Sequence, residues 1–513
     1  MSPQEMVLAV MFGALFAGIL SGIPAMLAIA GVPMLTALIA AQFGLFDLHF
    51  LNFFPARVWG VMTNTLLMAV PLFVLMGVLL ERSNLAEAML RILARMLGGS
   101  PRGMALSVLA FSALIAASTG IIGATVVMLV LISLKPMLDA GVHKRQASGL
   151  ICASGTLGQI IPPSILLVLL GDQIGNTYLE AQQRAGNFAP QPVSVADLFA
   201  GAMVPGLVLV GLYALWLLFT LRPAKGAVRV RGVSVPLRDI LFTFLPPMLL
   251  ILAVLGSILG GIATATEAAG LGAVGALLMA AFATARANSE RVVIALAGLS
   301  AFALVMLRIM GFGRAALDSP AGMLALAAAL LIGLGVLAAG ARLWRGRMLQ
   351  SALVETIRIS GMVFGIVIAA SMLALVFRGF GGDRTVSALM EALPGGDWGA
   401  LFLVMGVVFV LGFILEAVEI IYIVVPLLGP AVLGTDISPV WFAVLLAMNL
   451  QTSFLTPPFG FALFYFRSVA PASISTVDVY RGVIPYVLLQ LLALALIIAF
   501  PALATWLPDR IFG

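Results

Sequence analysis

Apolar runs of 18 or more residues recur along nearly the whole length of this 513-residue chain. Each run is long enough to cross about 30 Å of hydrocarbon as an α-helix. Since 62% of the residues are apolar and only 9% are charged, the chain has too little charge to cover a soluble domain. The segments of about ten alternating residues that build an outer-membrane barrel are missing. The sequence therefore predicts an all-α polytopic membrane protein embedded in a lipid bilayer.

Charge, cysteine content and short motifs exclude other classes of protein. The chain has a net charge of +6, and its Lys and Arg residues lie mostly in short loops without interleaved aromatic residues. Nucleic acid is therefore not an expected partner. The single cysteine, Cys152, cannot form an internal disulfide or a cysteine-rich metal site. The chain has no His-Glu-x-x-His zinc motif and no phosphate-binding loop, so neither a cofactor nor an ATP site is predicted. The first basic residue is Arg57, and a cleavable signal peptide is therefore not expected.

The basic residues are divided unevenly between alternate loops, and this predicts the orientation of the spans. Twenty of the 27 lie in one set of loops, at residues 82–102, 135–145, 222–238, 286–291, 342–358 and 467–481. Because loops rich in Lys and Arg stay in the cytoplasm, this set is predicted to be cytoplasmic. The C-terminus and the loop 175–193 are then predicted to be periplasmic. Residues 6–43 fit one long span or two short ones, which leaves the side of the N-terminus open.

Two apolar segments are predicted to enter the membrane and return to the same side. Residues 104–134 have basic loops on both flanks and are interrupted at Ser118-Thr119-Gly120. Residues 401–432 behave likewise from the opposite side, with an interruption between Gly412 and Glu419. A re-entrant helical hairpin accounts for both the charges and the interruption, provided that protein covers the irregular backbone.

The chain also contains an imperfect internal repeat. Residues 197–205 resemble residues 478–485, and Ile161-Pro162-Pro163 resembles Thr456-Pro457-Pro458. Consecutive prolines remove two backbone donors from a helix. One such site is consistent with a plain kink, whereas two at matched positions, each after a predicted hairpin, favour functional broken helices. The loop before the first Pro-Pro is basic and its counterpart is not, so the two copies are predicted to form an inverted repeat.

Three segments give the sequence a family resemblance. They are residues 153–164 (ASGTLGQIIPPS), 265–269 (ATEAA) and 449–460 (NLQTSFLTPPFG). In these segments the chain resembles the large membrane subunit, of the DctM type, of TRAP (tripartite ATP-independent periplasmic) transporters. The resemblance covers most of the chain in matching order.

The resemblance implies an elevator-type transporter of the bacterial inner membrane, with a mobile domain that holds both hairpins and both broken helices. It implies sodium ions as coupling ions, and two partners: a small TRAP membrane subunit and a periplasmic solute-binding protein. The implied substrate is a small organic acid, a carboxylate. Residues 415–420 are most similar to the branch associated with lactate, 2-oxo acids and related carboxylates.

The expected organisation follows from the hairpins and the repeat. N-terminal spans, mostly scaffold, occupy 1–103, and the first transport repeat occupies 104–197, with its hairpin at 104–134 and its broken helix at 148–171. Scaffold spans at 198–287, an extra helical pair at 288–342 and further scaffold spans at 343–400 follow. The second transport repeat occupies 401–475, with its hairpin at 401–432 and its broken helix at 440–466, and a C-terminal span occupies 476–513. Most family members lack the extra pair, which we interpret as peripheral scaffold or partner surface.

Sodium is a hard cation that prefers several oxygen ligands, and unwound backbone beside Ser and Thr supplies them without a buried charge. Packing between helices, or bonding to their own helix backbone, is the alternative role for these residues. The predicted sodium-binding residues are Ser118, Thr119, Gly120, Thr125, Ser154, Gly155, Thr156 and Pro162 in the first repeat, and Asn449, Gln451, Thr452, Ser453 and Thr456 in the second. The predicted substrate or gating residues are Gly123, Ser164, Glu416, Glu419 and Pro457.

Few charged residues lie within the apolar segments. Glu416 and Glu419 share one helix face, where they could serve the substrate or cap the second arm of the hairpin. The family usually has Asp where this chain has Glu416. Glu267 is expected to cap a helix, and Arg378 is expected to extend from a span end toward the lipid headgroups.

Two further functions stay open from the residues alone. A stand-alone ion-coupled dicarboxylate carrier of similar architecture would need no binding protein. An intramembrane lipid-modifying enzyme would need clustered His, Asp or Cys at the membrane interface, whereas this chain has two scattered histidines.

Overall fold

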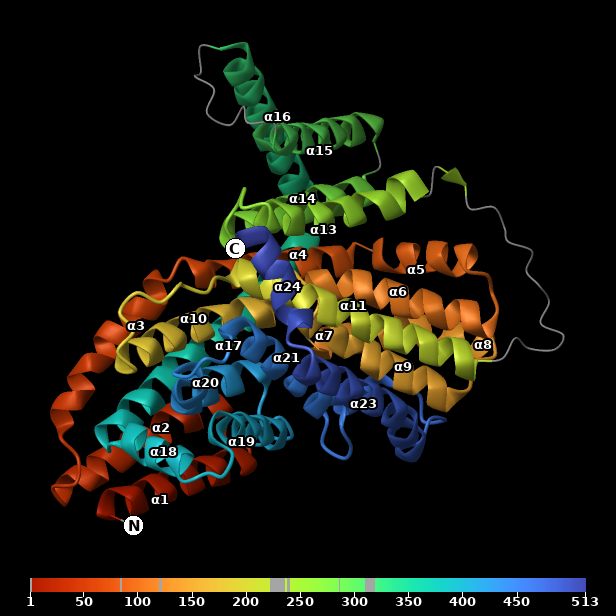
Figure 1. Ribbon diagram of the computed structural model, residues 1–513. Helices are drawn as coiled ribbons and strands as arrows, with labels where there is room; N and C mark the ends of the chain where they lie inside the picture. The colour runs from red at the N-terminus through yellow and green to blue at the C-terminus, as the bar shows by residue number, and fades with distance from the viewer. Residues whose placement is uncertain are drawn as a thin grey trace.

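The computed structural model describes residues 2–83, 85–119, 122–221, 236–237, 240–285, 287–309 and 319–513. Within these ranges every regular element is helical (Figure 1). Ten helical segments of the described chain are long and apolar enough to cross a membrane. The predicted all-α polytopic class is confirmed.

The structure describes the helices in the following order along the chain. The first part of the chain contains α1 (Pro3–Leu20), α2 (Ala25–Gln42), α3 (Phe54–Thr63), α4 (Ala69–Arg82), α5 (Leu85–Met96), α6 (Pro101–Thr119), α7 (Ile122–Leu129), α8 (Lys135–Asp139), α9 (Lys144–Thr156), α10 (Ile165–Arg184) and α11 (Val195–Thr220). The second part contains α13 (Leu245–Leu259), α14 (Ala265–Thr284), α15 (Asn288–Ile309), α16 (Pro320–Arg345), α17 (Met348–Gly379), α18 (Gly382–Glu391), α19 (Gly396–Leu411), α20 (Ala417–Leu433), α21 (Pro439–Leu455), α22 (Phe461–Val469), α23 (Thr476–Ala499) and α24 (Ala502–Phe512).

The N-terminal apolar stretch forms two helices and not one long span. α1 and α2 are separated by a turn in which Gly22 has a φ of 89°, a conformation that suits glycine. The following spans include a bent pair, because the helical segments Leu48–Thr63 and Leu66–Arg82 meet at 53°. Asn64 lies at the bend, where its side-chain oxygen accepts a hydrogen bond from the backbone N–H of Leu66 at 3.0 Å.

Both predicted hairpins and both predicted broken helices are present as interrupted helices. α6 and α7 occupy the segment predicted as the first hairpin, and residues 120–121 between them lie outside the described residues, so the return of the chain there stays a prediction. α19 and α20 form the second hairpin around the turn Gly412–Glu416. The chain departs from regular α-helix between α9 and α10 at residues 157–164, and between α21 and α22 at residues 456–460.

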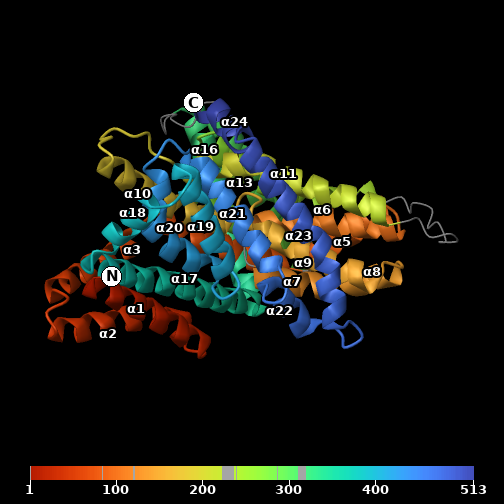
Figure 2. The same cartoon turned by 60° about the horizontal axis from the view of Figure 1, so that its bottom comes forward.

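The two repeats interlock in a reciprocal way. The second arm of each hairpin packs on the half-helix that follows the break in the other repeat, α7 on α22 and α20 on α10. The long helices that end the repeats exchange in the same manner, α11 packing on α21 and α23 on α9 (Figure 1). α17 runs along α2 at the base of the molecule in Figure 2 and also packs on α4 and α20. Each broken helix is thus enclosed by elements of both repeats.

The sequence repeat has a local physical cause. α11 and α23 both begin with a capping box that uses Asp197 or Asp478. Four residues later a glycine faces a close crossing. A Cβ on Gly201 would lie 2.9 Å from a carbonyl oxygen of α24, and a Cβ on Gly482 would lie 2.1 Å from the carbonyl oxygen of Arg145. The repeated Asp and Gly therefore fix a helix start and a contact between helix backbones.

Two helices extend beyond the rest of the bundle. α15 and α16 pack on each other and on α14, and they lie beyond α13 and α14 in Figure 1. Large apolar side chains on both helices are exposed, among them Leu299, Leu330 and Leu337. Such faces suit lipid or another membrane protein. The interpretation of the 288–342 segment as scaffold or partner surface stays a prediction.

Candidate functional site

The first broken helix is interrupted at its two consecutive prolines. α9 ends at Thr156 and α10 begins at Ile165. Pro162 and Pro163 lie between them and are buried, and their missing N–H groups prevent a regular helix there. The Ser164 hydroxyl donates at 3.1 Å to a carbonyl of the 3₁₀ turn that precedes the prolines. Protein therefore covers the irregular backbone, as a break at membrane depth requires.

The hydroxyl groups before this break differ in their bonding. Thr156 Oγ1 donates to the carbonyl of Ala153 at 2.8 Å and faces the Gln490 side-chain amide at 3.5 Å. The Ser154 hydroxyl is fully buried and has no hydrogen-bond partner in the part of the chain that the structure describes. A buried polar group without a partner costs about 1–3 kcal/mol. Among the described hydroxyls of this repeat, Ser154 is thus one that a ligand would satisfy.

The second broken helix repeats the same design with other residues. α21 ends just before Thr456, and Pro457 lies in the gap before α22. The Thr456 hydroxyl donates to the carbonyl of Thr452 at 2.7 Å, and the Thr452 hydroxyl donates to that of Met448 at 2.8 Å. Both threonines therefore bond to their own helix, which leaves oxygen lone pairs for a cation.

Two side chains of α21 attach the second hairpin. Asn449 Nδ2 donates to the carbonyl of Met405 at 2.7 Å, and Ser453 Oγ donates to that of Phe409 at 2.7 Å. Between them, Gln451 is fully buried, and neither polar atom of its side chain has a partner among the described residues. The second repeat therefore combines an anchored hairpin with one unsatisfied amide.

Glycines allow close approach at both hairpins. A Cβ on Gly155 would lie 2.3 Å from a methyl group of Val126 on α7, and a Cβ on Gly412 would lie 2.3 Å from the Ser453 hydroxyl. Gly123, at the start of α7, faces the ring of Tyr465 on α22, where a Cβ would lie 2.7 Å from the ring. Gly123, Gly155 and Gly412 thus have a packing role in the structure.

The two carboxylates of the second hairpin form a helix cap. Glu416 occupies the N-cap position of α20, and the Glu419 carboxylate accepts a hydrogen bond from the backbone N–H of Glu416 at 3.1 Å. The Tyr465 hydroxyl lies 3.5 Å from Glu416 Oε1. Tyr465 therefore contacts the first hairpin through its ring and the second through its hydroxyl. Glu267 has the capping role expected of it, in a capping box at the start of α14.

The remaining predicted ligands belong to the first hairpin. Thr125 lies on α7 and is buried. Ser118 and Thr119 end α6, but their side chains lie outside the described residues, as does the whole of Gly120. Those predicted residues of each repeat that the structure describes lie on a broken helix or on the hairpin that packs against it. Their roles as sodium ligands or gating residues stay predictions.

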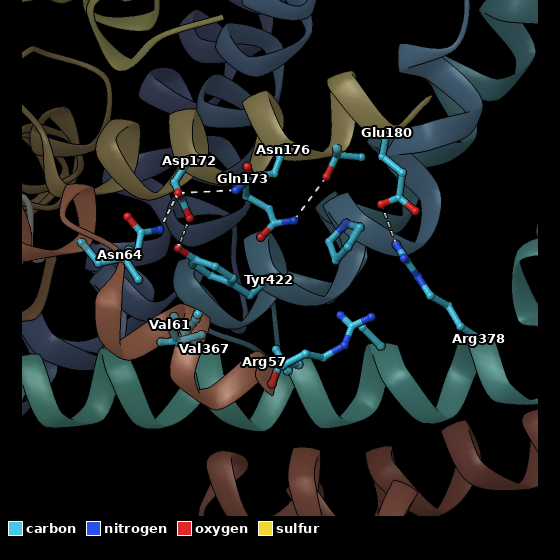
Figure 3. Close-up of a pocket in the computed structure, with 17 residues that line it drawn as sticks. Arg57, Val61, Asn64, Asp172, Gln173, Asn176, Glu180, Val367, Arg378 and Tyr422 are labelled. Atoms are coloured by element: carbon cyan, nitrogen blue, oxygen red, sulfur yellow. Dashed lines mark hydrogen bonds and ion pairs between the residues drawn. The ribbon is translucent and has the colours of Figure 1, made fainter. Parts of the chain in front are cut away.

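A cavity of about 320 Å³ lies outside the predicted set (Figure 3). Its walls come from α3, α10, α17, α20 and the bend after α3. The polar residues that line it are Arg57, Asn64, Asp172, Gln173, Asn176, Thr177, Glu180, Ser371, Arg378 and Tyr422. This volume is at the small end of the range for ligand sites in proteins.

Asp172 is the centre of the hydrogen-bond network in this cavity. It accepts from Asn64 at 2.9 Å, from Asn176 at 3.5 Å and from the Tyr422 hydroxyl at 3.2 Å. Asp172, Asn176 and Glu180 recur at intervals of four residues in the sequence, so they share one face of α10. That spacing is the sequence signal that could have indicated this polar face.

The expectation that Arg378 extends to the lipid headgroups is wrong. Its guanidinium donates to Glu180 at 2.8 Å across the cavity (Figure 3). Arg184 also donates to Glu180, at 2.7 Å, and reaches Asp383 on α18 at 2.9 Å. Arg378 stays in the protein because a carboxylate from another helix is within reach.

Comparison with known proteins identifies the family. Residues 12–311 and 295–503 match the family described as "Tripartite ATP-independent periplasmic transporter, DctM component". The chain belongs to this family. It is 25% identical over 502 residues to the C4-dicarboxylate TRAP transporter large permease protein DctM of Vibrio cholerae, covering 94% of this chain and 96% of that protein. It is 26% identical over 507 residues to the protein of the same name from Rhodobacter capsulatus, covering 98% of both.

More distant similarities extend to other substrates and to a solved structure. The ectoine TRAP transporter large permease protein TeaC of Halomonas elongata is 24% identical over 458 residues, covering 87% of each chain. The crystal structure of the Alcanivorax borkumensis YdaH transporter matches with a TM-score of 0.52 and 14% identity, over 90% of this chain and 89% of that one. At this identity the likeness concerns the fold alone.

Membership of the DctM family confirms the resemblance that the sequence segments indicated. As a family member with ten candidate spans in the described part of the chain, it is a multi-pass protein of the inner membrane. Its relatives are permeases, so it is a transport protein and not an intramembrane lipid-modifying enzyme.

Proposed function

We propose that this chain is the permease of a sodium-coupled secondary uptake system for a small organic acid. The acid is a carboxylate of the lactate or 2-oxo acid kind, delivered by a periplasmic solute-binding protein to a complex of this chain with a small membrane subunit. Relatives are named for C4-dicarboxylates and for ectoine, which differ as substrates. The proposed substrate class therefore rests on the resemblance of residues 415–420.

The observation that carries the sodium proposal is the pair of breaks with buried, unsatisfied polar groups. One break has Ser154 and the other has Gln451 without a partner among the described residues. Ser154 lies two residues before the end of α9 and Gln451 four residues before the end of α21. Where the chain leaves the regular helix, carbonyl oxygens become free to bind a hard cation. A sodium ion at each break would satisfy these groups without placing an unpaired charge in the membrane.

An elevator movement is the proposed transport step. Both hairpins and both broken helices pack on one another in a reciprocal arrangement, which would let them move as one body against α2, α3 and α17. The capped N-terminus of α20, with Glu416 and Glu419, lies beside the second break, where a gate for the substrate would act.

Uptake into proteoliposomes tests the proposal. The complex of both membrane subunits is reconstituted and supplied with the loaded binding protein, and labelled lactate, pyruvate and succinate are compared. Uptake is expected to require a sodium gradient and no ATP. Equal uptake with choline in place of sodium would refute the coupling, and full uptake without a binding protein would favour a stand-alone dicarboxylate carrier.

A further inference from the structure

Arg57 is a cation without a hydrogen-bonded or ion-paired partner among the described residues that line a protein cavity. It lies on α3 and lines the cavity of about 320 Å³ between α3, α10, α17 and α20. Its guanidinium has no hydrogen bond and no ion pair with any residue that the structure describes, and Figure 3 draws it in the cavity without a bond. The neighbouring cations Arg184 and Arg378 each have a carboxylate partner within 3 Å. Arg57 therefore differs from the other cations around it.

The carboxylates of the cavity are already engaged. Asp172 accepts from Asn64, Asn176 and Tyr422, and Glu180 accepts from two arginines. Glu180 attracts Arg57 electrostatically, but neither carboxylate forms a hydrogen bond or an ion pair with it. An ionised side chain within a membrane segment is costly unless it faces water or a partner, and such residues mark binding sites by default.

The walls of the cavity combine two parts of the molecule. α3 and α17 belong to the predicted scaffold, whereas α10 and α20 belong to the predicted transport repeats. Arg57, Arg184 and Arg378 are all among the basic residues that the charge distribution places on the periplasmic side. A ligand in this cavity would reach it from the periplasm and would contact both parts.

We propose that this cavity is an external reception site for a small carboxylate, and that Arg57 is the residue that binds it. The proposal rests on the proposed uptake function. A guanidinium pairs with a carboxylate through two parallel hydrogen bonds, and Asn176 and Ser371 offer polar groups for a hydroxyl or oxo substituent. The small volume suits an acid of a few carbons. The acid would bind here after it leaves the binding protein and before it reaches the helix breaks.

Cysteine labelling tests this site without transport. The chain's own Cys152 is fully buried, so its background reactivity is expected to be low. Asn176→Cys places a thiol in the cavity wall, and Asn187→Cys places a reference thiol in the exposed loop after α10. Spheroplasts with the complete membrane complex are labelled with an anionic and a cationic methanethiosulfonate reagent. Dividing the labelling rate of the anionic reagent by that of the cationic reagent cancels differences in intrinsic thiol reactivity between the two positions.

The ratio of the anionic to the cationic labelling rate is expected to be higher at Asn176→Cys than at Asn187→Cys. Arg57→Gln should lower that ratio by roughly fivefold, since one nearby charge is removed, and Arg57→Lys should restore most of it. Arg384→Gln, an exposed cation outside the cavity, is the matched control and should leave the ratio unchanged. Lactate, pyruvate or succinate should slow labelling in the parental chain more than chloride of equal ionic strength does.

Two results would overturn the reception site. One is a labelling ratio that Arg57→Gln does not change, and the other is slowing by none of the three acids beyond that of chloride. The labelling needs neither a sodium gradient nor uptake. If labelling gives either of these results while uptake still depends on sodium, only the reception site is refuted. If uptake proceeds equally in choline while protection from labelling still depends on Arg57, only the sodium coupling is refuted.

Discussion

The two broken helices share one topology but leave different positions unsatisfied. Counted back from the first proline of each pair, Ser154 and Asn449 occupy the same position, eight residues earlier. Thr156 and Gln451 likewise correspond, six residues before that proline. Ser154 lacks a partner among the described residues, while Asn449 bonds to the second hairpin. Thr156 bonds to its own helix, while Gln451 lacks a partner. Each repeat therefore offers a ligand a different group, so the two ion sites that we propose are not equivalent.

The same comparison separates the ways in which the hairpins are attached. Asn449 and Ser453 attach the second hairpin through hydrogen bonds to its backbone. At the first hairpin, Val126 packs against Gly155 with no space for an added methyl group. Hydrogen bonds between membrane helices contribute about 0.6 kcal/mol on average, whereas overpacking costs about 1–3 kcal/mol. The first repeat should respond most to added volume and the second to loss of polar groups.

Gly155→Ala should have the largest effect. The new Cβ would lie 2.3 Å from a methyl group of Val126, so α7 and α9 must separate, at a cost of about 1–3 kcal/mol. We expect a lower unfolding midpoint of the purified complex and uptake near background. Val126→Ala in the same chain should restore much of both. Val126→Ala should restore neither the unfolding midpoint nor the uptake of Gly412→Ala, where the clash is with Ser453. Equal rescue of both glycine variants would show that the two contacts are not independent.

Thr156→Val and Thr452→Val test whether each repeat holds an ion. Both threonines are fully buried, and their hydroxyls bond to their own helix. Valine keeps the shape of the threonine side chain and removes only the hydroxyl oxygen. We expect each variant to raise the sodium concentration for half-maximal uptake about tenfold, which corresponds to about 1.4 kcal/mol. The measurement is the sodium dependence of uptake at matched membrane expression. If both variants keep the parental curve, these threonines have a packing role only.

The hairpins, the breaks and the repeat could be predicted from sequence because each has a local cause. Consecutive prolines interrupt a helix wherever they occur. The repeated aspartate is a capping residue, and the repeated glycine lies four positions later at a helix crossing. Basic loops on both sides of residues 104–134 require a return of the chain to the same side. None of these inferences needs knowledge of which distant helices meet.

The cavity could not be predicted for the opposite reason. Its central contact joins Asn64 to Asp172, which are 108 residues apart, and Tyr422 comes from a third helix 250 residues beyond Asp172. The spacing on α10 marks a polar face but does not identify its partner. For the same reason the sequence alone predicts Arg378 at the headgroups, because it does not show that Glu180 on another helix lies near. Partners of polar groups depend on helix packing, which the sequence pattern does not specify.

Ser154→Ala and Ser453→Ala form a matched pair with the smallest expected effects. The Ser453 hydroxyl bonds to the carbonyl of Phe409 at 2.7 Å, so its loss should cost about 0.6–1 kcal/mol. The Ser154 hydroxyl has no partner among the described residues. Its removal should leave the stability in choline within about 0.5 kcal/mol of the parental value or raise it, because an unsatisfied buried group is lost.

Melting the purified complex in sodium and in choline measures both effects in one experiment. An ion that binds only the folded protein raises the unfolding midpoint. This rise should shrink in Ser154→Ala, because a cation ligand is lost although no hydrogen bond is. If Ser154→Ala is as destabilising in choline as Ser453→Ala, the hydroxyl is bonded after all, and the asymmetry between the repeats is wrong. If it leaves both the choline midpoint and the sodium-dependent rise unchanged, Ser154 binds no ion, and the first site must use the backbone oxygens and Thr156 instead.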